Sequence, residues 1–259
     1  SPLIDTLAKS VPHPAAFSLT YEIYKRMPND TDMSVFKKSG VPFLNFAFIG
    51  HWEAYHSPVD SPQNLDRGSL QQHGEAALSL ARAFGNTDLS RLAGDDAVYF
   101  TVLGRWFVHY PRGWIWPLAG VSLALVLAAS LYAGGAGDAT LRGIAKGFLF
   151  HLLGVILLAL IGYGTVILLA WLHRSRLPDG NVLQNPFYLL ALTALLAALW
   201  MAAFRILRKT VTAGNLVLGA ALLLFLTGLL AAIWLPGGSY IFHWPLLAVL
   251  LAVFFVSSA

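Results

Sequence analysis

Residues Lys146–Leu172 read KGFLFHLLGVILLALIGYGTVILLAWL, and this stretch decides the class of fold. It holds no acidic residue, one Lys and one His. A helix needs about 20 mostly apolar residues to cross the hydrocarbon core of a bilayer, so the stretch predicts a membrane-spanning helix. His151 inside it has two interpretations: a functional group, as ionisable residues within spans are by default, or a side chain near the span end that reaches the interface.

Further apolar runs surround this one along the second half of the chain. They are Trp114–Gly134, Pro186–Phe204, Asn215–Leu235 and Ile241–Ser257. Since no soluble domain of this size can cover five such runs, residues 114–259 are predicted to form an all-α polytopic membrane domain with about five helical spans. The chain begins at Ser1 without Met and stops inside the last run, so we expect a fragment cut at both ends.

Composition supports a membrane component. Hydrophobic residues make up 57% of the chain and charged residues 12%, against about 25% charged in soluble domains. Residues 1–113 carry a net charge of −1 and residues 114–259 a net charge of +5. The positive excess therefore lies in the apolar half, where it indicates membrane topology and not nucleic-acid binding. The absence of Cys excludes disulfides and thiolate chemistry.

The loops between the predicted spans differ in positive charge. The first and third loops hold Arg142, Lys146, Arg205, Arg208 and Lys209, whereas the second holds Arg174 and Arg176 and the fourth holds none. Because cytoplasmic loops carry the excess of Lys and Arg, we expect the odd loops in the cytoplasm. Residues 1–113 would then lie on the extracytoplasmic side, periplasmic or lumenal.

Residues 1–113 are predicted to be a water-soluble α/β piece. Val41–Ile49 (VPFLNFAFI) has the continuous apolar character of a strand in a covered sheet. The predicted helices are Ala15–Lys25 after Pro14, Met33–Ser39 ended by Gly40, and Asp66–Phe84 with Asp66 as N-cap. The apolar face expected on the last helix consists of Leu70, Ala77, Leu78, Ala81 and Phe84. Residues 91–113 are expected to form a juxtamembrane linker, in which Ala97–Tyr110 alternates aromatic and polar groups.

Candidate chemistry lies in residues 29–66, NDTDMSVFKKSGVPFLNFAFIGHWEAYHSPVDSPQNLD. The loop after the predicted strand presents Tyr55-His56, and ligands bind at the carboxyl ends of strands in open α/β sheets. A loop His can bind zinc through one ring nitrogen, and a Tyr hydroxyl can stabilise an oxyanion. Taken alone, however, a single loop His is most often an ordinary surface residue. The residues by themselves leave both interpretations open.

The same segment resembles the C-terminal part of the catalytic domain of di-zinc aminopeptidases, a metallopeptidase family that also includes glutaminyl cyclase-like members. The matching residues are Thr31-Asp32-Met33, Gly40-Val41-Pro42, the run to Ile49, Tyr55-His56-Ser57 and Asp60. The membrane-anchored branch of the family, with members in the endoplasmic reticulum and the vacuolar membrane, is similar in placing several spans after the peptidase domain. Its Gly-x-Ser-Tyr-x-Phe-x-Trp-Pro-Leu pattern is similar to Gly237–Leu246.

The resemblance implies roles for three residues and a cofactor. His56 would be the last metal ligand of a site with two zinc ions, and Tyr55 the catalytic hydroxyl that stabilises the tetrahedral intermediate. Asp32 would lie in the second shell or on the substrate side, while Asp60 would shape the loop. Residues 1–90 would be the C-terminal portion of the zinc peptidase domain, with peptides as substrates and the lipid bilayer as the other partner.

The resemblance also implies what this chain lacks. The family's other ligands (an early His, a bridging Asp, a Glu-Glu pair and another Asp) and its general base precede the matched residues, and nothing in Ser1–Asn29 fits them. We therefore expect the chain alone to be inactive and the intact parent to be a membrane-anchored zinc exopeptidase of the aminopeptidase type. The alternatives are a non-catalytic, peptidase-like ectodomain that serves as a binding or receptor module, and a polytopic membrane module with an incidental α/β head.

Overall fold

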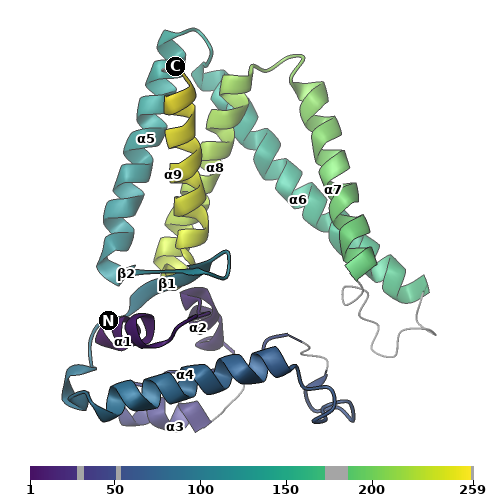
Figure 1. Ribbon diagram of the computed structural model, residues 1–259. Helices are drawn as coiled ribbons and strands as arrows, with labels where there is room; N and C mark the ends of the chain where they lie inside the picture. The colour runs from purple at the N-terminus through teal and green to yellow at the C-terminus, as the bar shows by residue number, and fades with distance from the viewer. Residues whose placement is uncertain (28–31, 51–53, 173–185, 258–259) are drawn as a thin grey trace. The chain divides into compact units, whose positions relative to one another are not determined.

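A computed structural model describes residues 1–27, 32–50, 54–172 and 186–257, with residues 32, 33, 37 and 252–257 described by their backbone alone (Figure 1). The chain divides into two compact units. The first contains Ser1–Leu118 and Leu229–Ile241, and the second contains Ala119–Gly228 and Phe242–Ala259. The chain therefore leaves the first unit once and returns to it for a short segment before its last helix.

The first unit is mainly helical. Its helices are α1 (Pro2–Ser10), α2 (Ser18–Tyr24), α3 (Asp32–Ser39) and α4 (Arg67–Gly85), with short 3-10 helices η2 (Leu89–Arg91), η3 (Arg112–Trp114) and η5 (Pro236–Gly238). Strands β1 (Ala97–Val102) and β2 (Trp106–Pro111) pair antiparallel in a hairpin. Leu103 and Gly104 take positive φ values of 50° and 66° in its turn, the geometry that a tight hairpin turn requires.

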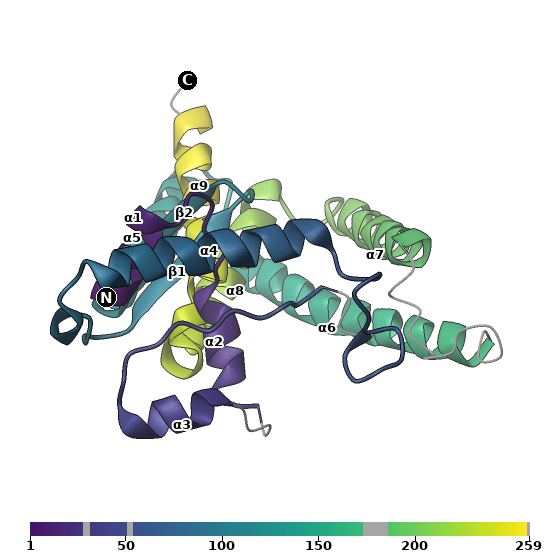
Figure 2. The ribbon, with the colours of Figure 1, turned by 60° about the horizontal axis from the view of Figure 1, so that its bottom comes forward.

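The predicted strand at 41–49 is wrong. Residues 41–49 form no regular element, and they are drawn as a plain tube after α3 in Figure 2. A strand needs a neighbour to satisfy its backbone N–H and C=O groups. Among the described residues β1 and β2 pair only with each other, so 41–49 has no ladder to join. Phe46, Phe48 and Ile49 are accordingly exposed, and Phe48 stacks on His73 of α4 with ring centroids 4.2 Å apart.

Helix α4 begins as predicted but buries a different face. The Asp66 carboxylate accepts a hydrogen bond from the backbone N–H of Ser69 at 2.6 Å, which confirms it as the N-cap. The buried residues are Ala76 and Leu80, whereas Leu70 and Leu78 of the predicted face are 52% and 53% exposed. Ala77 and Ala81 are exposed too, and of the predicted face only Phe84 packs against the core.

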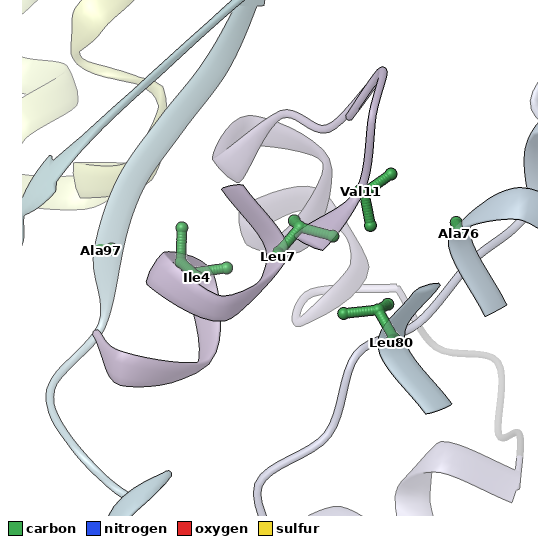
Figure 3. Close-up of a cluster of buried hydrophobic side chains, with 6 residues drawn as sticks. All are labelled: Ile4, Leu7, Val11, Ala76, Leu80 and Ala97. Atoms are coloured by element: carbon green, nitrogen blue, oxygen red, sulfur yellow. The ribbon is translucent and has the colours of Figure 1, made fainter. Parts of the chain in front are cut away.

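A hydrophobic cluster explains which face of α4 is covered. It consists of Ile4, Leu7, Val11, Ala76, Leu80 and Ala97 (Figure 3). Helix α1, which the sequence pattern did not predict, supplies Ile4 and Leu7 and packs directly on α4. Because α1 packs over the stripe of α4 that contains Ala76 and Leu80, that stripe is buried. The neighbouring apolar stripe, which contains Leu70 and Leu78, stays exposed to solvent.

The hairpin of β1 and β2 carries two apolar faces because successive strand side chains point to opposite sides. Ala97 faces the α1–α4 cluster, with Tyr99 and Phe107 packed against the same cluster. Val98 and Phe100 belong to a second cluster with Ile115, Ala232 and Tyr240. The Phe100 and Tyr240 rings stack with centroids 4.2 Å apart. Residues 97–111 thus lie between the two clusters of the first unit. Their alternating sequence pattern is typical of strands, whereas we had interpreted them as part of a linker.

The remaining helices form over the apolar runs, as predicted. They are α5 (Ile115–Gly135), α6 (Leu141–Leu172), α7 (Pro186–Leu207), α8 (Ala213–Trp234) and α9 (Tyr240–Ser257). Four of them, α5 to α8, are long and apolar enough to cross a membrane by length and composition. Helix α9 forms over the fifth run, but it is not among the candidate spans of the described part of the chain, so the fifth crossing stays a prediction.

Within the second unit, glycines let helices approach backbone to backbone. A Cβ added at Gly219 of α8 would collide with the backbone of Gly147 and Phe148 on α6, and one at Gly154 of α6 would collide with the Trp200 ring of α7. Small residues at such crossings are the usual device for packing membrane helices.

Two histidines on the apolar helices, His151 of α6 and His243 of α9, have packing partners. His151 Nδ1 lies 2.7 Å from the Gly147 carbonyl oxygen, and its ring contacts Trp200 with centroids 5.3 Å apart. His243 of α9 is buried, with its Nδ1 3.3 Å from Ser122 Oγ of α5. The His151 ring thus joins α6 to α7 through Trp200, and His243 joins α9 to α5 through Ser122.

Candidate functional site

The loop that holds the predicted site residues is stabilised by short-range hydrogen bonds. Ser57 donates to the Ala54 carbonyl oxygen through its backbone N–H at 3.0 Å and its hydroxyl at 2.8 Å. The Asp60 backbone N–H donates to the Ser57 carbonyl oxygen at 3.1 Å, and the Asn64 side-chain amide donates to the Val59 carbonyl oxygen at 2.8 Å. These local bonds define the loop from Ala54 to the N-cap of α4.

Tyr55 and His56 lie together at the start of this loop and face outward. The Tyr55 side chain is 73% exposed, His56 is also exposed, and their rings stack with centroids 4.0 Å apart. His56 has a φ of 57°, a left-handed conformation that few residues other than Gly adopt. Backbone outliers of this kind cluster at ligand sites, so this one is consistent with a site at His56.

The third predicted residue is only partly described. Asp32 is the first residue of α3, and its side chain lies outside the described residues, so its distance from His56 is not fixed. His51 and Glu53, which we interpreted as residues of the site rim, also lie outside the described residues. The structure therefore brings Tyr55 and His56 together and leaves the place of the Asp32 carboxylate open.

A metal fits this loop only in part. The His56 imidazole is exposed and of a type that binds zinc. However, the described part of the chain contains no group of three or more His, Cys, Asp or Glu side chains able to hold a metal ion. His56 can thus supply one ligand of a zinc site, and further ligands have to come from outside the residues described.

A second polar centre, which the sequence pattern did not reveal, joins α2 to η5. The buried Ser18 hydroxyl accepts a hydrogen bond from the Tyr99 backbone N–H at 3.0 Å and lies 2.5 Å from the Gly237 carbonyl oxygen. A Cβ at Gly237 would approach the Ser18 carbonyl oxygen to 3.0 Å, and one at Gly238 would come within 2.7 Å of the Leu19 side chain. The two glycines of the Gly237–Leu246 pattern therefore allow α2 to pack against the turn.

Glu22 completes this centre, which we call the α2–η5 contact. Its side chain is 5% exposed, and it accepts hydrogen bonds from Arg26 at 2.8 Å, Lys25 at 3.0 Å and the Gly237 backbone N–H at 3.3 Å. Burial alone would raise the pKa of Glu22, but the hydrogen bonds from Arg26 and Lys25 outweigh it and hold that pKa below its ordinary value. Arg26 also donates to the Trp234 carbonyl oxygen at the end of α8.

The α2–η5 contact agrees with four membrane crossings. Helices α5 to α8 lie in sequence between the hairpin and η5. An even number of crossings returns the chain to the side from which it started, and a contact between α2 and η5 requires that return. The contact is thus compatible with a crossing by each of these four helices.

Comparison with known protein families gives a match to the first part of the chain. The model of the family described as peptidase family M28 matches residues 1–81, a range that includes Asp32, Tyr55 and His56. The first part of the chain is therefore similar to this peptidase family. With its apolar helices, the chain is a multi-pass membrane protein similar to membrane metallopeptidases.

Individual relatives match over less than half of the chain. Endoplasmic reticulum metallopeptidase 1 of Homo sapiens is 26% identical over 116 residues, and putative endoplasmic reticulum metallopeptidase 1-A of Caenorhabditis elegans is 29% identical over 116 residues. In both, the match covers 42% of this chain and 13% of the relative. The chain thus corresponds to a small part of each relative's length. No solved structure gives a significant match.

Proposed function

We propose that the intact protein is a membrane-anchored zinc exopeptidase of the aminopeptidase type. The observation that carries this proposal is the family match over residues 1–81 together with the adjacent, exposed Tyr55 and His56 side chains in that range. In this proposal the neutral His56 imidazole binds one of two zinc ions. Zinc in such a site supplies Lewis acidity toward the scissile carbonyl group and an activated water.

Tyr55 and Asp32 act on the substrate in this proposal. The Tyr55 hydroxyl donates a hydrogen bond to the oxygen of the scissile carbonyl as negative charge develops there, which favours the tetrahedral intermediate over the bound peptide. The exposed ring can reach a substrate without displacing any buried neighbour. Asp32 is proposed to act from the second shell or the substrate side, and its position at the first residue of α3 is compatible with either.

Metal removal tests this function. Treatment of the intact protein with a zinc chelator is expected to lower the release of N-terminal residues from a short peptide by at least about 100-fold, because Lewis acidity contributes several kcal/mol to the transition state. Added zinc should restore the rate. A chelator analogue that does not bind zinc is the control. Hydrolysis that persists without metal would contradict the zinc mechanism, and metal-independent peptide binding without hydrolysis would favour a non-catalytic binding module.

We also propose that the first unit lies on the extracytoplasmic side of the membrane. The support is the distribution of positive charge at two helix connections. Arg142 and Lys146 lie in the first turns of α6, and Arg205, Arg208 and Lys209 lie at or just after the end of α7. This arrangement would expose the site loop to peptides outside the cytoplasm.

Cysteine labelling tests the side, because the chain has no Cys of its own. Gln72 on α4 and Ala136 after α5 are both exposed, so a cysteine at either position is accessible to a maleimide. In sealed membranes with the extracytoplasmic face outward, an impermeant maleimide should label Gln72→Cys before permeabilisation and Ala136→Cys only after it. The reverse order would show that the first unit is cytoplasmic.

A further inference from the structure

A cavity beside the α2–η5 contact has the composition of a phosphate site. Its volume is about 370 Å³. The polar part of its wall consists of Glu22 of α2, Lys25 and Arg26 just after α2, and Arg112 of η3, and the apolar part consists of Ile233, Trp234 and Pro236. All of these residues belong to the first unit. The cavity is separate from the Tyr55-His56 loop, which supplies none of its wall.

The wall carries an excess of positive charge. Glu22 is ionised, because its bonds to Arg26 and Lys25 hold its pKa low, and it offsets one of the three cations. The nearest carboxylate to Arg112 is that of Asp96 at 3.7 Å, where both side chains are 51% exposed and their attraction is screened. Lys25 and Arg112 therefore both retain donors for a bound anion, and the Arg112 guanidinium is a fork suited to two phosphate oxygens.

The wall of this cavity includes residues at the ends of two candidate spans. Trp234 is the last residue of α8, and Arg112 begins the first candidate span, Arg112–Gly135. The Ile233 and Trp234 side chains are 54% and 69% exposed although both are large and apolar. Trp residues at span ends lie at the level of lipid headgroups, with the apolar ring edge toward the acyl chains. An anion that enters here meets cations on one side and lipid-facing side chains on the other.

The geometry points to a binding site for the phosphodiester group of a membrane phospholipid, held by Lys25 and Arg112 with Trp234 against its glycerol and upper acyl region. Basic clusters next to a span recognise anionic lipid headgroups by this combination of charge and interfacial position. A soluble phosphorylated ligand would use the cations but gain nothing from Ile233 and Trp234. The bound lipid would rest against α2 and η5 residues next to the end of α8, within the first unit.

Lipid retention by the full chain tests this site. Purified in detergent and analysed by native mass spectrometry with added dioleoyl phosphatidylglycerol, the Lys25→Gln/Arg112→Gln variant is expected to bind at least about tenfold more weakly than the unaltered chain. The matched control is Arg82→Gln/Arg91→Gln, which removes two exposed cations remote from the cavity wall and should bind normally. Arg112→Lys keeps the charge and should recover most of the binding. Arg26 is left intact because it bonds to Trp234 and Glu22.

Three comparisons separate the possible results. Phosphatidylglycerol should bind and dioleoylglycerol, which lacks phosphate, should not. Equal binding of dioleoylglycerol, or equal loss in both double variants, would overturn the proposal. Displacement of bound lipid by millimolar inorganic phosphate would also overturn it, by showing that the cavity recognises free phosphate. The thermal unfolding midpoint of each variant, measured in the same detergent, identifies any loss of binding that comes from misfolding.

Discussion

Replacing His56 with alanine in the intact protein is expected to remove at least one of its zinc ions and to lower aminopeptidase kcat/KM by more than about 100-fold. Substitution of a residue that only orients a metal ligand lowers metal affinity or activity by about 10–100-fold. Loss of a direct ligand should therefore lower them further. Folding should survive because His56 is exposed and stacks on the neighbouring Tyr55 ring, which is exposed too. The measurements are zinc content by elemental analysis and initial rates on a short peptide.

Two further variants make the His56 result specific. His13→Ala removes an exposed loop histidine outside the site and should leave zinc and rate unchanged. Tyr55→Phe should keep its zinc while kcat falls by about 10²–10³-fold, the usual cost of losing one oxyanion donor. A His56→Ala protein with both metals and full activity would show that this histidine is not a ligand. Loss of zinc in His13→Ala as well would point to general destabilisation.

Introducing leucine at Gly219 is expected to lower the free energy of unfolding by about 3 kcal/mol or more. We expect this to be the largest effect of a substitution in the second unit. A side chain there would collide with backbone atoms of Gly147 and Phe148, which cannot rotate away as a side-chain tip can. Helices α6 and α8 would have to separate. The loss in free energy of unfolding is therefore expected at or above the upper end of the range for overpacked core substitutions. The thermal unfolding midpoint of the full chain in detergent should fall sharply.

Gly164→Leu provides the control for this change. It makes the same substitution within α6, where the described part of the chain places nothing within 4 Å of an added Cβ. Its midpoint should stay within a few degrees of the unaltered chain, because leucine has the higher helix propensity. Equal midpoints for the two variants would mean that α6 and α8 do not pack at these glycines.

The helices of the second unit were predictable because their signal is local. A run such as Lys146–Leu172 needs no partner to form a helix, since all its backbone hydrogen bonds lie within the run. The N-cap at Asp66 is local in the same way, as is the end of α3 at Gly40, whose φ of 71° suits glycine. In these cases the chemistry that decides the structure lies within a few residues along the chain.

Features that depend on distant partners were not predictable. The run 41–49 has the composition of a buried strand, but composition does not provide a neighbouring strand. The stripes on α4 that contain Leu78 and Leu80 are both apolar, and only the position of α1 decides that Leu80 is buried. The hairpin at 97–111 showed a period of two that could have identified it, although its role between two clusters depends on Ile115, Ala232 and Tyr240.

The same distinction between local and distant partners applies to the candidate site. Adjacent residues such as Tyr55 and His56 are necessarily near each other, and the structure adds their exposure and the left-handed backbone of His56. The place of Asp32 relative to them depends on tertiary structure and stays a prediction. Glu22 gave no sequence signal of its own, because its partner Gly237 is 215 residues away.

That separation has a consequence for the order of events during synthesis. Ser18 and Gly237, which meet in the α2–η5 contact, are 219 residues apart. At about 5–20 residues per second, a ribosome needs roughly 10–40 s to travel from one to the other. Throughout that interval Glu22 has its two basic neighbours but not the backbone N–H that completes its burial. The first unit therefore cannot finish folding until the fourth apolar helix has been made, and insertion of the helices precedes closure of the domain that begins the chain.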